Sequence, residues 1–169
     1  LVALNLVSIL DSADVVDINY GAAATIGSSD VQNITTSGSA RTVELAGLES
    51  ANITTSGNAS TIILTDTSAA DVLASITVSG GSALTLTGTG STAVSTVNAG
   101  SMTAALTLDV SASTAATMTV TGGTGDDSFN IGTITSADTV VGGDGTDTLI
   151  TAAAVSAANA AGVSEIEAV

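Results

Sequence analysis

The residues of this chain most suited to chemistry are two clusters of glycine and aspartate. GGTGDDSFN spans residues 122–130, and GGDGTDTLI spans residues 142–150. Glycine lets a turn adopt positive φ and brings backbone carbonyls close to a bound ion, while aspartate supplies carboxylates. Calcium prefers a shell made of such oxygen atoms. The two clusters therefore predict a pair of calcium-binding loops.

Within the loops, we expect the carboxylates of Asp127 and Asp147 to be the principal ligands. The other candidate ligands, which supply carbonyl oxygens or further carboxylates, are Gly123, Thr124, Gly125, Asp126, Gly143, Asp144, Gly145 and Thr146. Phe129 and Leu149 follow each aspartate by two residues and are expected to point inward. Without an ion, stacked carboxylates repel each other at short range, so folding of this part should depend on calcium.

The composition excludes several classes of function. Sixteen acidic residues stand against a single basic residue, Arg41, and the formal net charge is −15. Binding to nucleic acid or to an anionic membrane surface needs many Lys and Arg side chains. The chain has no His, Cys or Lys, so it lacks the usual catalytic bases and the usual ligands of zinc, haem and iron–sulfur clusters. Only hard oxygen ligands remain.

Catalysis by carboxylates is also not expected. Asp126 and Asp127 are adjacent, but consecutive residues point in different directions, and no matched partner for glycosidase chemistry is evident. No apolar run approaches the ~18 residues that a membrane-spanning helix needs. We therefore predict a protein that is not an enzyme and that does not insert into membranes.

An internal repeat of about twenty residues organises the chain. NITTSGSA at residues 33–40 recurs as NITTSGNA at residues 52–59. Each unit has a short β-branched strand, a polar turn centred on glycine, and a second alternating strand, which is the pattern of short β-strands. The turn glycines are Gly38, Gly57, Gly80, Gly100, Gly122 and Gly142.

Such a repeat predicts an all-β fold, a parallel β-solenoid or β-roll of about seven coils. Core positions that follow the turn glycines at similar offsets are Val43, Ile62, Leu84, Leu106, Phe129 and Leu149. A thin core of this kind has little room for aromatic residues, and only Tyr20 and Phe129 are aromatic. The alternative fold is a β-sandwich, which would usually contain a buried aromatic and antiparallel hairpins.

We expect four segments along the chain. Residues 1–30 form the first strands, 31–121 the Ser/Thr-rich coils, 122–150 the calcium-binding coils, and 151–169 a short Ala-rich helix followed by the start of a further coil. The helix is expected over residues 152–162, with Gly162 as its stop. Asp138 is either a lone ligand on the opposite edge or a turn residue, and we favour the turn. Neither end resembles a natural terminus, so we expect part of a longer protein.

The two nonapeptides match the calcium-binding solenoid repeat G-G-x-G-x-D-x-U-x, where U is a large apolar residue. This part of the chain resembles the RTX family, whose secreted members fold such repeats into a parallel β-roll in calcium-rich surroundings. Strict RTX arrays repeat every nine residues, which places loops of one side eighteen residues apart. In this chain the two loops lie twenty residues apart.

The wider arrangement, Thr/Ser/Ala-rich coils punctuated by these loops, is similar to bacterial surface-layer proteins. That resemblance implies a secreted structural protein of the cell surface, in which calcium orders the solenoid and joins copies of the chain into a lattice or filament. A cell-surface polysaccharide is a further partner that the resemblance leaves open. The alternative function is a calcium-stabilised adhesin or fibre-stalk module.

Overall fold

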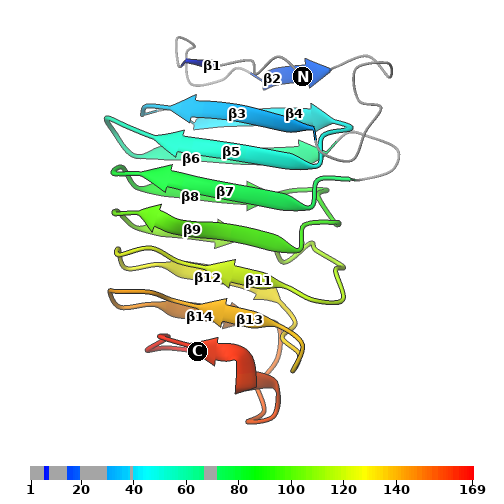
Figure 1. Ribbon diagram of the computed structural model, residues 1–169, viewed down its shortest axis with the longest axis vertical. Coiled ribbons are helices and arrows are strands. Elements are labelled where there is room, and N and C mark those ends of the chain that lie inside the picture. The colour runs from blue at the N-terminus through cyan, green and yellow to red at the C-terminus, as the bar shows by residue number, and fades with distance from the viewer. Residues whose placement is uncertain (1–5, 8–14, 20–29, 39, 67–71) are drawn as a thin grey trace.

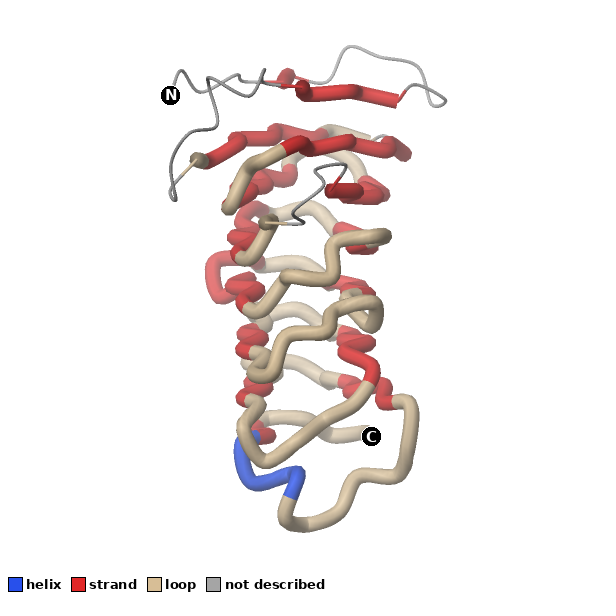
Figure 2. The backbone as a smooth tube through the Cα atoms, turned by 90° about the vertical axis from the view of Figure 1, so that its right-hand side faces the viewer, coloured by secondary structure: helices blue, strands red, loops and turns tan. Residues whose placement is uncertain are grey.

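The polypeptide coils into a parallel β-solenoid whose turns stack along one axis (Figure 1). The computed structural model describes residues 6–7, 15–19, 30–38, 40–66 and 72–169. Each turn contributes one strand to each of two parallel sheets, which we call sheet A and sheet B. Figure 2 shows the two stacks of strands facing each other.

Sheet A has eight strands, in the order β1-β3-β5-β7-β9-β11-β13-β15. Its strands are β1 (Leu6–Val7), β3 (Val31–Thr36), β5 (Ser50–Thr55), β7 (Ser75–Gly80), β9 (Thr96–Met102), β11 (Thr119–Thr121), β13 (Thr139–Val141) and β15 (Val163–Ser164). Sheet B has seven strands, in the order β14-β12-β10-β8-β6-β4-β2. Its strands are β2 (Val15–Asn19), β4 (Ala40–Ala46), β6 (Ser60–Asp66), β8 (Leu84–Gly88), β10 (Leu106–Asp109), β12 (Ser128–Gly132) and β14 (Thr148–Thr151).

This architecture confirms the predicted all-β parallel solenoid. Every pairing between described strands is parallel, as in β3 with β5 and β4 with β6. Parallel strands need a crossover connection, which here is the strand of the opposite sheet. The alternative β-sandwich, which requires antiparallel hairpins, is wrong.

The core fills the space between the sheets. Strand residues alternate between buried and more exposed, because successive side chains of a strand point to opposite faces. In β6, for example, Ser60, Ile62, Leu64 and Asp66 are buried and the residues between them are partly exposed. Among the described residues, the buried hydrophobic side chains are Leu, Ile, Val and Ala together with Met102, Met118 and the aromatic Phe129.

The stacking register differs in part from the expected core columns. Leu84 lies opposite Leu106, and Phe129 lies opposite Leu149, as predicted. The other expected neighbours are displaced by two residues, and the observed pairs are Val43 with Leu64, Ile62 with Leu86, and Leu108 with Phe129. A shift of two keeps each side chain on the core face, so alternation alone does not distinguish these registers.

The Ala-rich helix expected over residues 152–162 is wrong. Only a single 3₁₀ turn, Asn159–Gly162, forms there, and none of its residues is buried. Short helices are marginal in water unless they bury an apolar face, and in this segment only Val155 packs against the core. It instead crosses from β14 to β15, and Asn159 donates a hydrogen bond from Nδ2 to the carbonyl oxygen of Ile134. Within the described ranges, no helix has the length and apolarity needed to cross a bilayer.

Candidate metal centre

The two glycine–aspartate loops stack one turn apart at a single corner of the solenoid. One loop connects β11 to β12, and the other connects β13 to β14. Their backbones approach so closely that side chains are excluded: a Cβ atom on Gly122 would collide with the carbonyl oxygen of Gly142, and one on Gly142 would collide with that of Glu165. These glycines are required by the contact between neighbouring turns.

The two loops share a sequence pattern but differ in backbone conformation. Gly143 and Gly145 have positive φ values of 106° and 127°, whereas Gly123 and Gly125 do not have positive φ. In the first loop the backbone amide of Gly123 donates a 2.8 Å hydrogen bond to Oδ2 of Asp127. No corresponding hydrogen bond from Gly143 to Asp147 is formed in the second loop, where Oδ2 of Asp147 is left without a partner.

Asp127 lies inside the corner and is 2 % exposed. Its Oδ1 accepts a 2.7 Å hydrogen bond from the amide of Leu106, one turn earlier, and its Oδ2 accepts the bond from Gly123. Burial raises the pKa of this carboxyl above its ordinary value, the two amide bonds oppose that rise, and the charge of Asp126 adds to it. Both carboxylate oxygens of Asp127 are therefore engaged by backbone amides.

Asp147 is fully buried and occupies the equivalent position in the next turn. Its Oδ1 accepts a 2.7 Å hydrogen bond from the amide of Asp127, while its Oδ2 is buried with no hydrogen-bond partner. Burial raises the pKa of Asp147; the Asp127 amide opposes that rise, and the charges of Asp127, Glu167 and Asp126 add to it. Buried charges are stable only when paired, so this oxygen is the least satisfied atom of the site.

The same contact repeats once more toward the C-terminal end. Oε2 of Glu167 accepts a 2.6 Å hydrogen bond from the amide of Asp147. Asp127, Asp147 and Glu167 thus form a column of three carboxylates, each of which caps a backbone amide of the preceding turn. We call this column the carboxylate ladder. Sequence analysis did not include Glu167, although the twenty-residue spacing from Asp147 repeats the spacing between the two aspartates.

The remaining predicted ligands lie on the outer part of the same corner. Asp126 and Asp144 are exposed at the loop tips. Oδ1 of Asp126 accepts a 2.9 Å hydrogen bond from the amide of Thr146, and the amide of Asp144 donates to the carbonyl oxygen of Gly123. Among the other predicted residues, Thr124, Gly145 and Thr146 are exposed, Gly125 and Gly143 are partly buried, and Gly123 is buried.

The donor chemistry of these loops fits a hard cation, because every side-chain donor is an oxygen atom. The unpartnered Oδ2 of Asp147 is the atom that a cation would satisfy. A complete shell is not assembled: across the described parts of the chain, no three acidic side chains lie close enough together to hold a metal ion. The structure brings the predicted residues to one corner, but it directs the Asp127 carboxylate to backbone amides.

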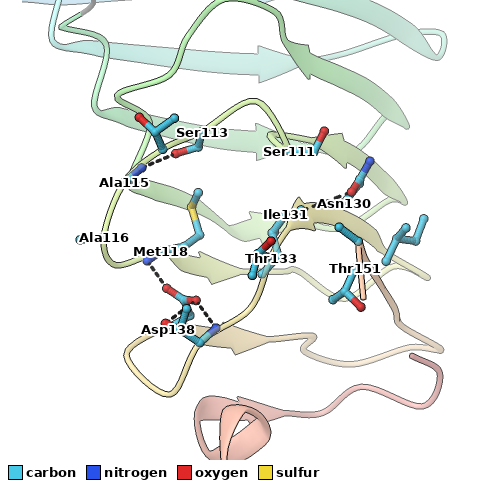
Figure 3. Close-up of a pocket in the computed structure, with 15 residues that line it drawn as sticks. Ser111, Ser113, Ala115, Ala116, Met118, Asn130, Ile131, Thr133, Asp138 and Thr151 are labelled. Atoms are coloured by element: carbon cyan, nitrogen blue, oxygen red, sulfur yellow. Dashed lines mark hydrogen bonds between the residues drawn. The ribbon is translucent and has the colours of Figure 1, made fainter. Parts of the chain in front are cut away.

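Asp138 performs a similar capping role at the opposite corner (Figure 3). Its Oδ2 accepts hydrogen bonds from the amide and the hydroxyl of Thr135, at 2.7 and 3.0 Å. Its Oδ1 accepts a 2.7 Å bond from the amide of Met118, one turn earlier. These contacts are those of a turn residue, the reading favoured from the sequence. Glu49, which was not singled out, accepts a bond from the amide of Asp30 in the same way.

A groove of about 610 Å³ lies beside Asp138, between the turns that contain residues 111–116 and 130–135 (Figure 3). Most of its hydroxyl groups already donate hydrogen bonds to other groups of the solenoid. Ser113 donates to the carbonyl oxygen of Val94, Ser111 donates to Asp109, and Thr151 donates to the carbonyl oxygen of Ala153. The groove therefore does not present a set of unengaged polar groups aimed at a ligand.

Fold and corner chemistry together define a β-solenoid protein whose turns are joined by carboxylate-to-amide hydrogen bonds. No family model matches the chain, and neither curated proteins nor solved structures provide a significant match.

Proposed function

We propose that this chain is a calcium-dependent extracellular structural protein, a segment of a self-assembling surface layer or filament. The observation that carries the proposal is the buried, unpartnered Oδ2 of Asp147, which lies within a column of like charges at the two nonapeptide loops. A divalent cation at this corner would offset that charge. Calcium is a hard cation that binds carboxylate and carbonyl oxygens in flexible geometries, which suits ligands supplied by loops.

The residues that would hold the ion are Asp147 and the loop residues around it. Calcium, when bound, supplies positive charge among carboxylates that otherwise repel one another. Asp127 ties the first loop to the preceding turn through the Leu106 amide and closes its own loop through the Gly123 amide. Asp147 joins the second loop to the first through the Asp127 amide. Asp126 and Asp144 add exposed carboxylates at the loop tips. The corner would then be more rigid with the ion than without it.

The shape of the molecule supports a building-block role. The turns stack into a rod with two regular sheets along its length (Figure 1). The high negative charge would oppose the growth of an assembly from free subunits, and calcium would reduce that repulsion between copies of the chain.

Electron microscopy of the purified chain at millimolar calcium and in excess chelator tests this function. Ordered sheets or filaments that disappear with chelator are expected. Dispersed, folded particles under both conditions would overturn calcium-driven assembly and would favour the adhesin or fibre-stalk alternative. Calcium titration calorimetry should accompany the imaging. We expect Asp147→Asn to abolish the binding heat, and Asp109→Asn, which alters a carboxylate outside the loops, to retain it.

A further inference from the structure

The outer face of sheet A is uncharged in a chain that is otherwise strongly acidic. None of the eight strands of this sheet contains Asp, Glu, Lys or Arg. The strands of sheet B, in contrast, include Asp17, Arg41, Glu44, Asp66 and Asp109. The acidic residues of the described chain therefore lie on sheet B, at the corners and at the C-terminal end, and they leave one broad side of the rod neutral.

The neutral face presents regular columns of hydroxyl and amide side chains. One column runs through Asn33, Asn52, Thr77, Asn98 and Thr121, which stack in register on successive strands. Neighbours within the columns bond to each other: Nδ2 of Asn52 donates to Oδ1 of Asn33 at 2.9 Å, and the hydroxyls of Thr54 and Ser79 lie 3.4 Å apart. These side chains are short and already oriented, so little conformational entropy remains to be lost on binding.

We propose that this face, called the sheet A face, pairs with the same face of a second copy of the chain. The proposal rests on the proposed self-assembling function and names the surface involved. Two copies that each carry a charge of −15 repel each other in most orientations, but contact through the sheet A faces places no carboxylate of one strand against another. Two identical faces also share the same strand spacing of ~4.8 Å, so their columns match along the whole rod.

The available area is sufficient for such a contact. The six strands from β3 to β13 cover a face roughly 30 Å long and about 17 Å wide, given the spacing and rise of β-strands. Pairing would bury roughly 500 Å² on each copy, or about 1,000 Å² in total, which is close to the minimum for a specific interface. A contact between identical faces is isologous and closes as a two-fold dimer. Assembly beyond the dimer would use other surfaces.

Sedimentation velocity in excess chelator, over a range of protein concentrations, tests the proposal. The variant Thr77→Glu/Asn98→Glu places two charges at adjacent exposed positions of the sheet A face, on β7 and β9. The matched control Thr85→Glu/Thr107→Glu places the same charges at adjacent exposed positions of sheet B, on β8 and β10 of the same turns. Circular dichroism and urea unfolding of both variants check that each is folded.

We expect the wild-type chain and the sheet B variant to dimerise, and we expect the sheet A variant to associate about a hundredfold more weakly, because like charges would face each other across the contact. A wild-type chain that stays monomeric, or a sheet A variant that associates as tightly as the control, would overturn the proposal. Retention of the monomer on a neutral polysaccharide, lost in the sheet A variant, would assign the face to a glycan instead.

The same variants separate this proposal from the proposed function. Calcium-dependent sheets that form equally well from the sheet A variant would overturn the pairing and leave calcium-driven assembly intact. Dimers in chelator without any ordered assembly in calcium would support the pairing and overturn the proposed function.

Discussion

Oδ1 of Asp147 accepts a 2.7 Å hydrogen bond from the backbone amide of Asp127, one turn earlier in the solenoid. Each aspartate of the repeated nonapeptide thus accepts a hydrogen bond from a backbone amide of the preceding turn, since Asp127 accepts one from the amide of Leu106 in the same way. The two carboxylates differ in their second oxygen: that of Asp127 is satisfied by Gly123, and that of Asp147 is not. This difference leads to the first prediction.

Asp127→Asn should destabilise the calcium-free protein more than Asp147→Asn does. An asparagine at position 127 would direct an NH₂ group at one of two backbone amides, which leaves a buried donor unsatisfied at a cost of about 1–3 kcal/mol. At position 147 the NH₂ group can replace the unpartnered oxygen, and the substitution removes a charge from the carboxylate ladder. Urea unfolding in excess chelator measures both free energies. Equal losses, or a larger loss for Asp147→Asn, would contradict this view of the ladder.

The calcium-free protein should gain stability from Asp127 and Asp147 as the pH falls. Burial raises the pKa of both carboxyls above the ordinary value of 3.8, so the folded state binds protons more tightly than the unfolded state does. Their contribution is fully present below pH 3.8 and is lost as the pH rises through the raised folded-state pKa values. Urea midpoints measured at neutral and mildly acidic pH in chelator check the direction, and Asp147→Asn should reduce the change.

The contribution of Asp109 to stability should have the opposite pH dependence. Partial burial tends to raise the pKa of Asp109, but hydrogen bonds from the hydroxyl and amide of Ser111 and from Asn130 outweigh it and lower the pKa below 3.8. Its contribution to stability is therefore present above pH 3.8 and is lost as the pH falls through the lowered value. In the Asp109→Asn variant, this loss of stability at acidic pH should be absent. A free energy of unfolding that falls at acidic pH as much in the variant as in the wild-type chain would contradict the lowered pKa of Asp109.

Gly122→Ala should strongly destabilise the stacked loops. The added Cβ would collide with the carbonyl oxygen of Gly142, a backbone atom of the next turn that cannot move away without separating the turns. Steric overlap in a packed site typically costs about 1–3 kcal/mol, and occasionally more. Gly81→Ala is the matched control, because Gly81 does not have positive φ and its nearest neighbour would be Oγ1 of Thr103 at 3.5 Å. Urea midpoints should fall for Gly122→Ala and stay nearly constant for Gly81→Ala.

Phe129→Ala should cost about 3–5 kcal/mol, the range for loss of a buried aromatic side chain. Phe129 is fully buried and packs in register between Leu108 and Leu149. Ile150→Ala provides the comparison, because Ile150 lies on the next strand but is 47 % exposed. Thermal or urea unfolding that shows similar losses for the two variants would mean that the core does not extend to this turn.

The sequence by itself determined the fold class and the location of the candidate site. Turn glycines at intervals of about twenty residues and alternating Val, Ile, Leu and Thr predict stacked short strands, and a repeat that buries nothing alone must stack on its neighbours. The sequence also contains the information that the Asp127 side chain points inward, because Asp127 precedes Phe129 by two residues and the side chains of a strand alternate. Each of these features depends on local spacing, which a sequence displays directly.

Tertiary structure decided the register and the roles of the carboxylates. Columns displaced by two residues satisfy the same alternation, so only the packed turns distinguish Leu86 from Leu84 as the neighbour of Ile62. Alanine content predicted a helix over residues 152–162, but the crossing to β15 buries no helical face, and a 3₁₀ turn forms instead. The nonapeptides resemble each other, yet the φ of Gly143 differs from that of Gly123. Whether a carboxylate is satisfied depends on the amide that the neighbouring turn or its own loop presents, and such contacts exist only after the turns have stacked.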